Sequence, residues 1–218
     1  MDTNNLLKMF IETVKGRWPE ILKSLSQHMQ LTLIALSLAI LISVPLGIFL
    51  TRHKRFADIV IGITAVFQTI PSLALLGFLI PFLGIGTTPA IVALTIYGLL
   101  PILRNTYTGI VGVDGAQIEA GKGMGMTSLQ ILFMVEIPSA LNIIMAGIRT
   151  ATVLIIGVTT LASLVGAGGL GDLIFRGISS VNSGLILAGA VPAALLAIFF
   201  ENILKWFEKK VTPKGLKQ

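Results

Sequence analysis

Five apolar stretches dominate this 218-residue chain, and each has the character of a membrane span. A helix needs about 20 mostly apolar residues to cross about 30 Å of hydrocarbon. The stretches run at about 31–50, 59–83, 89–103, 142–165 and 185–204. The second stretch is interrupted by the sequence QTIPS and by a second proline, Pro81. We therefore predict an all-α, multi-pass membrane protein with five transmembrane helices.

The composition agrees with a membrane-embedded unit. Hydrophobic residues make up 54% of the chain and charged residues 12%, whereas a soluble domain carries about 25% charged residues. The net charge of +6 does not indicate a nucleic-acid binder, because the basic residues lie at the edges of the apolar blocks and form no single patch. The chain has no cysteine, so we expect neither disulfides nor thiolate-bound metals.

The chain divides into three regions. Residues 1–24 are too charged to span a bilayer, but their apolar residues recur at helical spacing, which predicts an amphipathic helix in the membrane interface. A frayed extension of the first span is an equally good interpretation. The start does not resemble a cleavable signal peptide, so we expect the first span to be retained. We assign residues 25–205 to the transmembrane domain and residues 206–218 to a basic cytoplasmic tail.

The positions of lysine and arginine predict the orientation, because these residues are enriched in cytoplasmic segments. Five spans place eleven of the 16 basic residues on one side and five on the other. The larger group is Arg52, Lys54, Arg55, Arg104, Lys122, Arg149, Lys205, Lys209, Lys210, Lys214 and Lys217. The smaller group is Lys8, Lys15, Arg17, Lys23 and Arg176. We therefore expect the N terminus outside, and the C terminus and the segment around Glu119 in the cytoplasm.

The motifs that would indicate enzyme chemistry are absent or incomplete. The Gly-Lys pair at 121–122 lacks the spacing, the preceding strand and the following hydroxyl of a phosphate-binding loop. The sequence GAGGLG at 166–171 follows a membrane helix, so we interpret it as a turn at the outer end of the fourth span. His28 and His53 are isolated, and we expect both at the membrane interface. We predict no catalytic residues and no metal site in this chain.

The segment EAGKGMG, which begins at Glu119, is small, polar and glycine-rich within an apolar chain. Together with VEIP downstream, it resembles the cytoplasmic loop of importer-type ABC permeases, E-A-A-x(3)-G-x(9)-I-x-L-P. The matching positions are Glu119, Ala120, Gly121, Gly125, Val135, Ile137 and Pro138. Gly121 stands where the pattern has its second Ala, and Val135 and Ile137 stand for Ile and Leu. In that family the loop folds as a short helix-turn-helix that docks into a groove on the ATPase.

The residue types suit such a docking loop. Small Ala and Gly side chains allow a partner to approach the backbone closely. Gly125 permits a turn with positive φ, which other residues adopt rarely. We expect Pro138 to stop the second helix of the loop at the membrane.

A longer likeness points to one subgroup of the family. The segments FQTIPS, GKGMGMT, EIP, IMAGIRT, GAGGLGD and VTPKGL resemble permeases of bacterial osmoprotectant uptake systems for glycine betaine, carnitine and choline. The resemblance implies a permease subunit of the bacterial cell membrane that forms the translocation path. It also implies three partners: an ATP-binding subunit that holds ATP and Mg, a second identical or homologous permease, and a separate extracellular solute-binding protein. No cofactor is expected in this chain.

The broken second span is the predicted translocation path. Pro71 removes a backbone donor and frees a carbonyl, and irregular backbone at membrane depth is tolerated where it lines a cavity. Gln68, Thr69 and Ser72 add neutral polar groups, although Ser and Thr also serve simple helix packing. Only Arg149 brings a charge into a span, so we expect no coupling-ion site. Two alternatives stay open: an ABC permease for another small solute such as an amino acid, and a membrane scaffold without transport.

Overall fold

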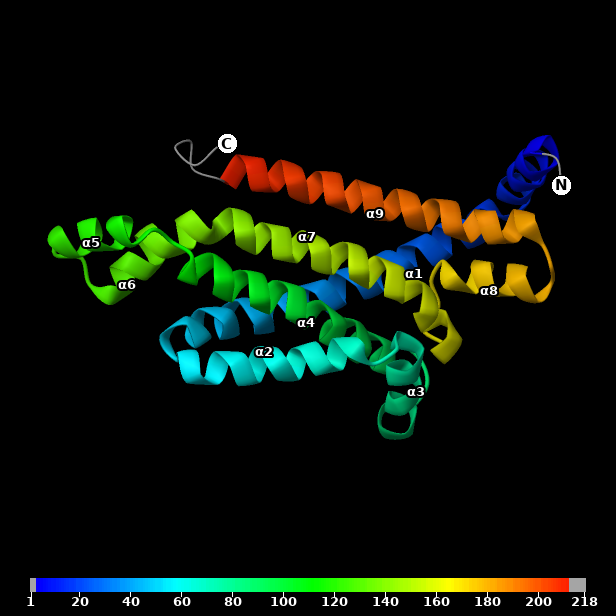
Figure 1. The fold of residues 1–218 in the computed structure, drawn as a ribbon. Helices are drawn as coiled ribbons and strands as arrows, with labels where there is room; N and C mark the ends of the chain where they lie inside the picture. The colour runs from blue at the N-terminus through cyan, green and yellow to red at the C-terminus, as the bar shows by residue number, and fades with distance from the viewer. Residues whose placement is uncertain (1–2, 212–218) are drawn as a thin grey trace.

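The computed structural model describes residues 3–211, and every regular element in that range is helical (Figure 1). The helices in chain order are α1 (Thr3–Arg52), α2 (Lys54–Thr69), α3 (Ser72–Leu83), α4 (Thr87–Val111), α5 (Gly115–Gly123), α6 (Ser128–Ile131), α7 (Ile137–Ala162), α8 (Gly171–Ser179) and α9 (Ser183–Val211). A π-helical turn (Leu132–Glu136) joins α6 to α7, and a 3-10 turn (Ser163–Val165) follows α7. The predicted all-α class is confirmed for the described residues.

Four long helices are apolar enough to cross a membrane by themselves. They are α1, α4, the continuous helix Ser128–Val165 that contains α6 and α7, and α9. Helices α2 and α3 form a fifth candidate only as a pair, because they meet at 98° across the break between Thr69 and Ser72. The predicted interruption of the second span is therefore confirmed. A count of four or five spans depends on whether this bent pair crosses the bilayer.

Helix α4 packs against both α1 and α7, and the largest buried cluster lies along these contacts. Small residues allow the close approach. A Cβ atom on Gly98 of α4 would lie 2.9 Å from the Cβ of Ala39 in α1. A Cβ atom on Gly147 of α7 would lie 2.7 Å from the carbonyl oxygen of Pro101 in α4. Without these glycines the helices could not pack at these distances, which is the usual role of small residues between membrane helices.

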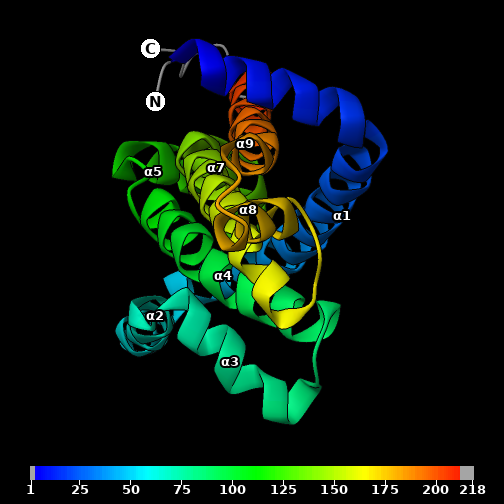
Figure 2. The same cartoon turned by 90° about the vertical axis from the view of Figure 1, so that its right-hand side faces the viewer.

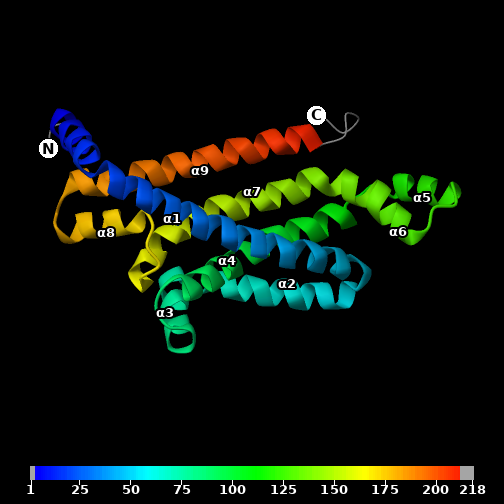
Figure 3. The same cartoon turned by 180° about the vertical axis from the view of Figure 1, so that it is seen from behind.

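The long helices run between two ends of the bundle, which Figures 1 and 3 show from opposite sides. One end, the loop end, holds α5, α6, the turn between α1 and α2, and the last turns of α9. The other, the α8 end, holds the start of α1, the glycine-rich turn at 166–171 and α8. The basic segments that the sequence places on one side of the membrane thus lie at one end. Which side of the membrane each end faces stays a prediction.

Helix α1 changes direction near its start. Arg17 has non-helical backbone angles, φ −123° and ψ 21°, next to Pro19, whose ring excludes the regular helix on its N-terminal side. Figure 2 shows the segment before the break crossing α9. The change in direction lies at residue 17, within the segment 1–24 that we predicted as an interfacial helix. Residues 206–211 of the predicted tail continue α9, and residues 212–218, including most of VTPKGL, lie outside the described part.

Pro138 does not stop a helix, so that expectation was wrong. It lies in the first turn of α7, and the helix continues from Ser128 through Val165. The π-helical turn just before it explains the continuity. The amide of Ile137 donates to the carbonyl of Leu132, five residues back, which realigns the backbone ahead of a residue that has no amide hydrogen. The helix that begins in the loop at Ser128 therefore continues without a break into α7.

His28, for which we predicted a position at the membrane interface, is buried inside the helix bundle. Its side chain is fully buried in the bundle, and its Nε2 lies 3.1 Å from the carbonyl oxygen of Ile156 in α7, which can only accept a hydrogen bond. A buried imidazole in contact with a backbone acceptor is a packing element between α1 and α7. His53 is exposed in the turn between α1 and α2, where a position at the membrane interface is still expected.

Candidate functional site

Helix α5 begins at a side-chain cap. The Oδ1 of Asp114 accepts a hydrogen bond from the amide of Ala116 at 3.0 Å, which satisfies one of the free amides at the start of the helix. Glu119 and Ala120 in the middle of α5 are exposed, and only Gly121 is buried. Two of the three residues that open the predicted docking motif therefore face outward, where a partner can reach them.

A tight turn at Gly125 separates α5 from α6. Gly125 has φ 77°, the positive value that the sequence suggested. Its amide donates to the carbonyl of Lys122 at 2.9 Å, and the amide of Met126 donates to the carbonyl of Gly121 at 3.1 Å. These bonds close the end of α5. A side chain at position 125 would find open space, so the backbone conformation is what demands glycine there.

Helix α6 starts at a capping box that the sequence analysis missed. The Oγ1 of Thr127 accepts from the amide of Gln130 at 3.3 Å, and the Oε1 of Gln130 accepts from the amide of Thr127 at 2.8 Å. The signal was present as Thr-x-x-Gln directly before an apolar run. The box fixes where α6 begins and holds the entry to the helix.

The two loop helices pack at Gly121. A Cβ atom there would lie 3.4 Å from the Cγ1 of Ile131 and from the Sδ of Met126. This is an ordinary van der Waals distance. The site therefore has room for the Ala that the family pattern carries at this position.

Apolar side chains at the tip of the loop face outward, and the sequence analysis missed them. Met124 is 75% exposed, Leu129 67% and Phe133 64%. Large apolar side chains with this exposure on a short loop favour a contact surface for a partner. The sequence did carry a signal for this surface, because all three large apolar residues lie at positions that the family pattern leaves open (x). We call Met124, Leu129 and Phe133 the loop tip.

The remaining motif residues lie where the loop joins the bundle. Val135, Ile137 and Pro138 are half-buried. The Oγ of Ser139 in α7 donates to the Oε1 of Gln117 in α5 at 3.0 Å and so ties the two helices together. The seven predicted docking positions therefore form one connected structure at the loop end, with Glu119, Ala120 and Gly125 exposed and the others packed.

The residues predicted for the translocation path lie apart from this loop, at the break between α2 and α3 (Figure 1). Thr69 and Pro71 are exposed, and Gln68 and Ser72 are half-buried. The Oγ1 of Thr69 donates to the carbonyl of Val66 at 2.7 Å, so its hydroxyl is engaged within its own helix.

Two backbone carbonyl oxygens beside the break have hydrogen-bond partners. The carbonyl oxygen of Phe67 accepts from the amide of Ile70 at 3.3 Å. The carbonyl oxygen of Ile70 accepts from the hydroxyl of Tyr97 in α4. The expectation that Pro71 leaves an unpaired carbonyl was therefore wrong, because a turn bond and a tyrosine from α4 satisfy the backbone.

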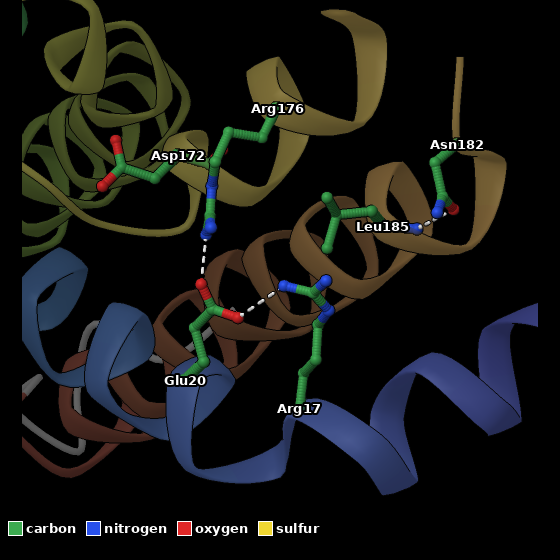
Figure 4. A network of polar contacts seen from close by, with 6 residues as sticks. All are labelled: Arg17, Glu20, Asp172, Arg176, Asn182 and Leu185. Atoms are coloured by element: carbon green, nitrogen blue, oxygen red, sulfur yellow. Dashed lines mark hydrogen bonds and ion pairs between the residues drawn. The ribbon is translucent and has the colours of Figure 1, made fainter. Parts of the chain in front are cut away.

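Polar contacts join α1 to α8 at the α8 end (Figure 4). Glu20 accepts from Arg17 at 3.2 Å and also pairs with Arg176 of α8. Burial raises the pKa of the Asp172 carboxyl, and the nearby positive charge of Arg176 opposes this rise. The Oδ1 of Asn182 accepts from the amide of Leu185 at 3.0 Å and caps the start of α9.

The sequence GAGGLG at 166–171 forms a turn between α7 and α8, as predicted. Gly166, Gly168 and Gly169 have φ between 78° and 96°, values that suit glycine. The amide of Gly169 donates to the Oε1 of Gln27 at 3.2 Å, which holds the turn against α1. Within residues 3–211, no group of three or more His, Cys, Asp or Glu side chains has the arrangement to hold a metal ion.

Residues 43–213 match the family described as binding-protein-dependent transport system inner membrane component. The chain belongs to this family. As a member, it is a multi-pass permease of a bacterial transporter. The family assignment covers the loop, the bent pair α2–α3 and α9.

The chain is also similar to curated permeases of this kind. It is 52% identical, over 97% of its length and 96% of the relative, to the glycine betaine/carnitine/choline transport system permease protein OpuCB of Bacillus subtilis. It is 53% identical, over 88% of each chain, to the carnitine transport permease protein OpuCB of Listeria monocytogenes. It is 50% identical to the choline transport system permease protein OpuBB of Bacillus subtilis, over 96% of this chain and 95% of the relative.

Solved structures confirm the fold. A chain of the MetNI methionine ABC transporter in an inward-facing conformation superposes with a TM-score of 0.78 at 24% identity, covering 88% of this chain and 96% of that one. A chain of an amino acid ABC transporter superposes with a TM-score of 0.73 at 23% identity, covering 92% and 98%. At this identity the likeness is one of fold alone.

Proposed function

We propose that this chain is the permease subunit of a bacterial ABC importer for a compatible solute of the glycine betaine, carnitine or choline type. The observation that carries the proposal is the 50–53% identity to permeases named for these solutes, which extends over nearly the whole chain for two of them. The chain supplies the membrane path and no catalytic residues. The alternative solute class, amino acids, is supported only by likeness of fold.

The ATP-binding subunit docks on the loop end. Helices α5 and α6 form the coupling helix-turn-helix, and Glu119, Ala120 and the loop tip face the partner. Exposed Met124 and Leu129 supply apolar contact area, and the acidic Glu119 suits a basic rim on the partner. ATP and Mg bind to that subunit, and this chain holds neither.

A second permease, identical or homologous, completes the path. Both α2 and α3 carry large apolar side chains that face outward, including Val66 at 63% and Phe78 at 65% exposed. Apolar surfaces of this kind are stable in contact with lipid or with another permease. In this arrangement α2 and α3 count as one broken span, which gives five spans with the N terminus outside and the C terminus in the cytoplasm of the bacterial cell. Gln68, Thr69, Pro71 and Ser72 lie along the path between the two permeases.

Reconstituted transport tests the proposal. The chain, its ATPase and its solute-binding protein are placed in lipid vesicles, and uptake of labelled glycine betaine, carnitine, choline and methionine is measured with and without ATP. We expect ATP-dependent uptake of at least one of the first three solutes that requires the solute-binding protein. Uptake of methionine alone would assign a different solute class. Failure of the chain to bind any ATPase subunit would instead support a scaffold.

A further inference from the structure

Glu136 is a buried acidic residue at the base of the loop, at the unspecified position just before the Ile-Pro of the motif. It is the last residue of the π-helical turn, and only 4% of its surface is exposed. An ionised carboxylate in such a place needs a partner, because its loss of water is otherwise unfavourable. π-helical turns of this kind are frequent at functional sites in proteins.

The partner of Glu136 is Arg52, 84 residues earlier in the chain. The Nη1 of Arg52 donates to the Oε1 of Glu136 at 3.2 Å, and its Nη2 donates to Oε2. The guanidinium therefore holds both carboxylate oxygens, the two-pronged geometry that lysine cannot reproduce. The carboxylate side is buried, whereas the arginine side chain is 47% exposed.

The pair adds a polar contact to the apolar packing between α1 and α7, at the base of the loop. Arg52 is the last residue of α1, and only His53 separates it from α2. Glu136 lies between α6 and α7, in a helix that runs without interruption from the loop into the bundle. A displacement of α6 would therefore act through Glu136 on the end of α1 and on the start of α2, which leads to the break at Pro71.

We propose that Arg52 and Glu136 are positioning residues for coupling, which pass movement of the ATPase-docked loop to α1 and to the bent pair α2–α3. The inference rests on the proposed function. Neither Arg52 nor Glu136 is one of the seven motif positions, and their ion pair connects the loop to α1 and α2. Loss of the pair should therefore lower the amount of solute transported per ATP hydrolysed, in addition to any effect on the stability of the complex.

The test separates coupling from stability with two variants. Arg52→Met leaves a buried, unpaired carboxylate, so we expect a low yield of assembled complex as well as poor coupling. Arg52→Met/Glu136→Leu replaces both partners by apolar groups of similar size, which is often nearly neutral for stability. We expect this double variant to assemble at wild-type yield, yet to transport several-fold less solute per ATP hydrolysed in vesicles.

The matched control is Arg149→Met. Arg149 in α7 pairs with Glu208 in α9 at 3.0 Å, so it also joins two helices, but neither residue belongs to the loop or to α1. We expect its ratio of solute transported to ATP hydrolysed to equal that of the wild type. An equal fall in this control would overturn the inference, because any lost ion pair would then produce the effect.

The outcomes distinguish the inference from the function on which it rests. If the wild-type complex shows no ATP-driven uptake of any solute, the proposed function fails. If the wild type transports and the double variant keeps the wild-type ratio, the function stands and the inference fails. A double variant that assembles, hydrolyses ATP and transports several-fold less per ATP supports the inference.

Discussion

An ion pair joins α1 to a later helix at each end of the bundle, but the two pairs differ in burial. At the loop end, the carboxylate of Glu136 is 5% exposed and is held by Arg52. At the α8 end, Glu20 is 33% exposed and Arg176 50%. Exposed pairs contribute little to stability, at most about 1 kcal/mol, whereas removing one partner of a buried pair costs about 3–5 kcal/mol. The loop end thus has the ion pair with the more buried carboxylate.

The two ends also differ in their apolar surfaces. At the loop end, Met124 and Leu129 project from a short loop that is tied to α7 and capped at both helix starts. At the α8 end, Val181 is 89% exposed in the turn that joins α8 to α9. A rigid base with an exposed apolar tip is suited to transmit force from a partner. The predictions below test whether this difference is functional.

Gly125→Val has the largest expected effect. The positive φ at this position excludes a β-branched side chain, so we expect α6 to be displaced. Stimulation of the ATPase by the solute-binding protein and solute uptake should then be lost, while membrane insertion is kept. The measurement is ATPase stimulation by loaded solute-binding protein, beside the yield of complex. Gly123→Val is the matched control, because it also points into open space but has no positive φ. Normal stimulation in Gly125→Val would mean that the loop is not the coupling element.

Leu129→Glu is expected to weaken binding of the ATPase subunit by more than tenfold. Burying a leucine contributes about 2 kcal/mol, and a charge in its place adds a desolvation penalty. Ile178→Glu places the same charge on an exposed residue of the α8 end and should leave ATPase binding unchanged. Affinity measured in nanodiscs checks both. Equal weakening by the two variants would remove the distinction between the ends.

Val181→Asn should stabilise the α8 end. Val181 has φ 51°, a conformation that costs a β-branched residue about 1–2 kcal/mol and that asparagine tolerates better. We expect a rise of a few degrees in the thermal unfolding temperature, with transport unchanged. Val181→Thr keeps the β-branch and should give no gain. A lower unfolding temperature for the asparagine variant would show that the valine is not strained.

Gly121→Ala has the smallest expected effect. The new methyl group meets Ile131 and Met126 at 3.4 Å, and alanine favours a helix over glycine by about 0.5–1 kcal/mol. Transport and ATPase stimulation should stay at the wild-type level. A loss of coupling in this variant would mean that the methyl group displaces Ile131, and with it α6, from α5.

The local features of both ends could be predicted from the sequence, because each depends on a few adjacent residues. The broken second span follows from Pro71, the turn follows from Gly125, and the glycine-rich turn follows from its composition. The continuity of α6 with α7 could not be predicted, because a π-helical turn accommodates Pro138. The pairing of Arg52 with Glu136 and the burial of His28 depend on contacts between helices far apart in the sequence.

The helix lengths also exceed the apolar stretches that predicted them. Helix α1 begins at Thr3 and α9 continues to Val211, well beyond the apolar windows, because charged and polar residues extend a helix into water at no cost to its hydrogen bonding. An apolar stretch thus locates a membrane span but underestimates the length of the helix that contains it. The exposure of the loop tip could not be predicted for the same reason, because hydropathy averages do not show which side chains of a short helix face outward.

Accessibility of single cysteines tests the difference between the two ends most directly. The chain has no cysteine of its own, so Met124→Cys and Ser180→Cys each introduce one reactive site, at the loop tip and the α8 end. A membrane-impermeant thiol reagent is applied to intact cells and to inside-out vesicles, with and without the ATPase subunit. We predict that Cys at 124 reacts only in inside-out vesicles and is protected by the ATPase, whereas Cys at 180 reacts only in intact cells. Labelling of position 124 from outside, or with the same yield when the ATPase is bound, would contradict the account.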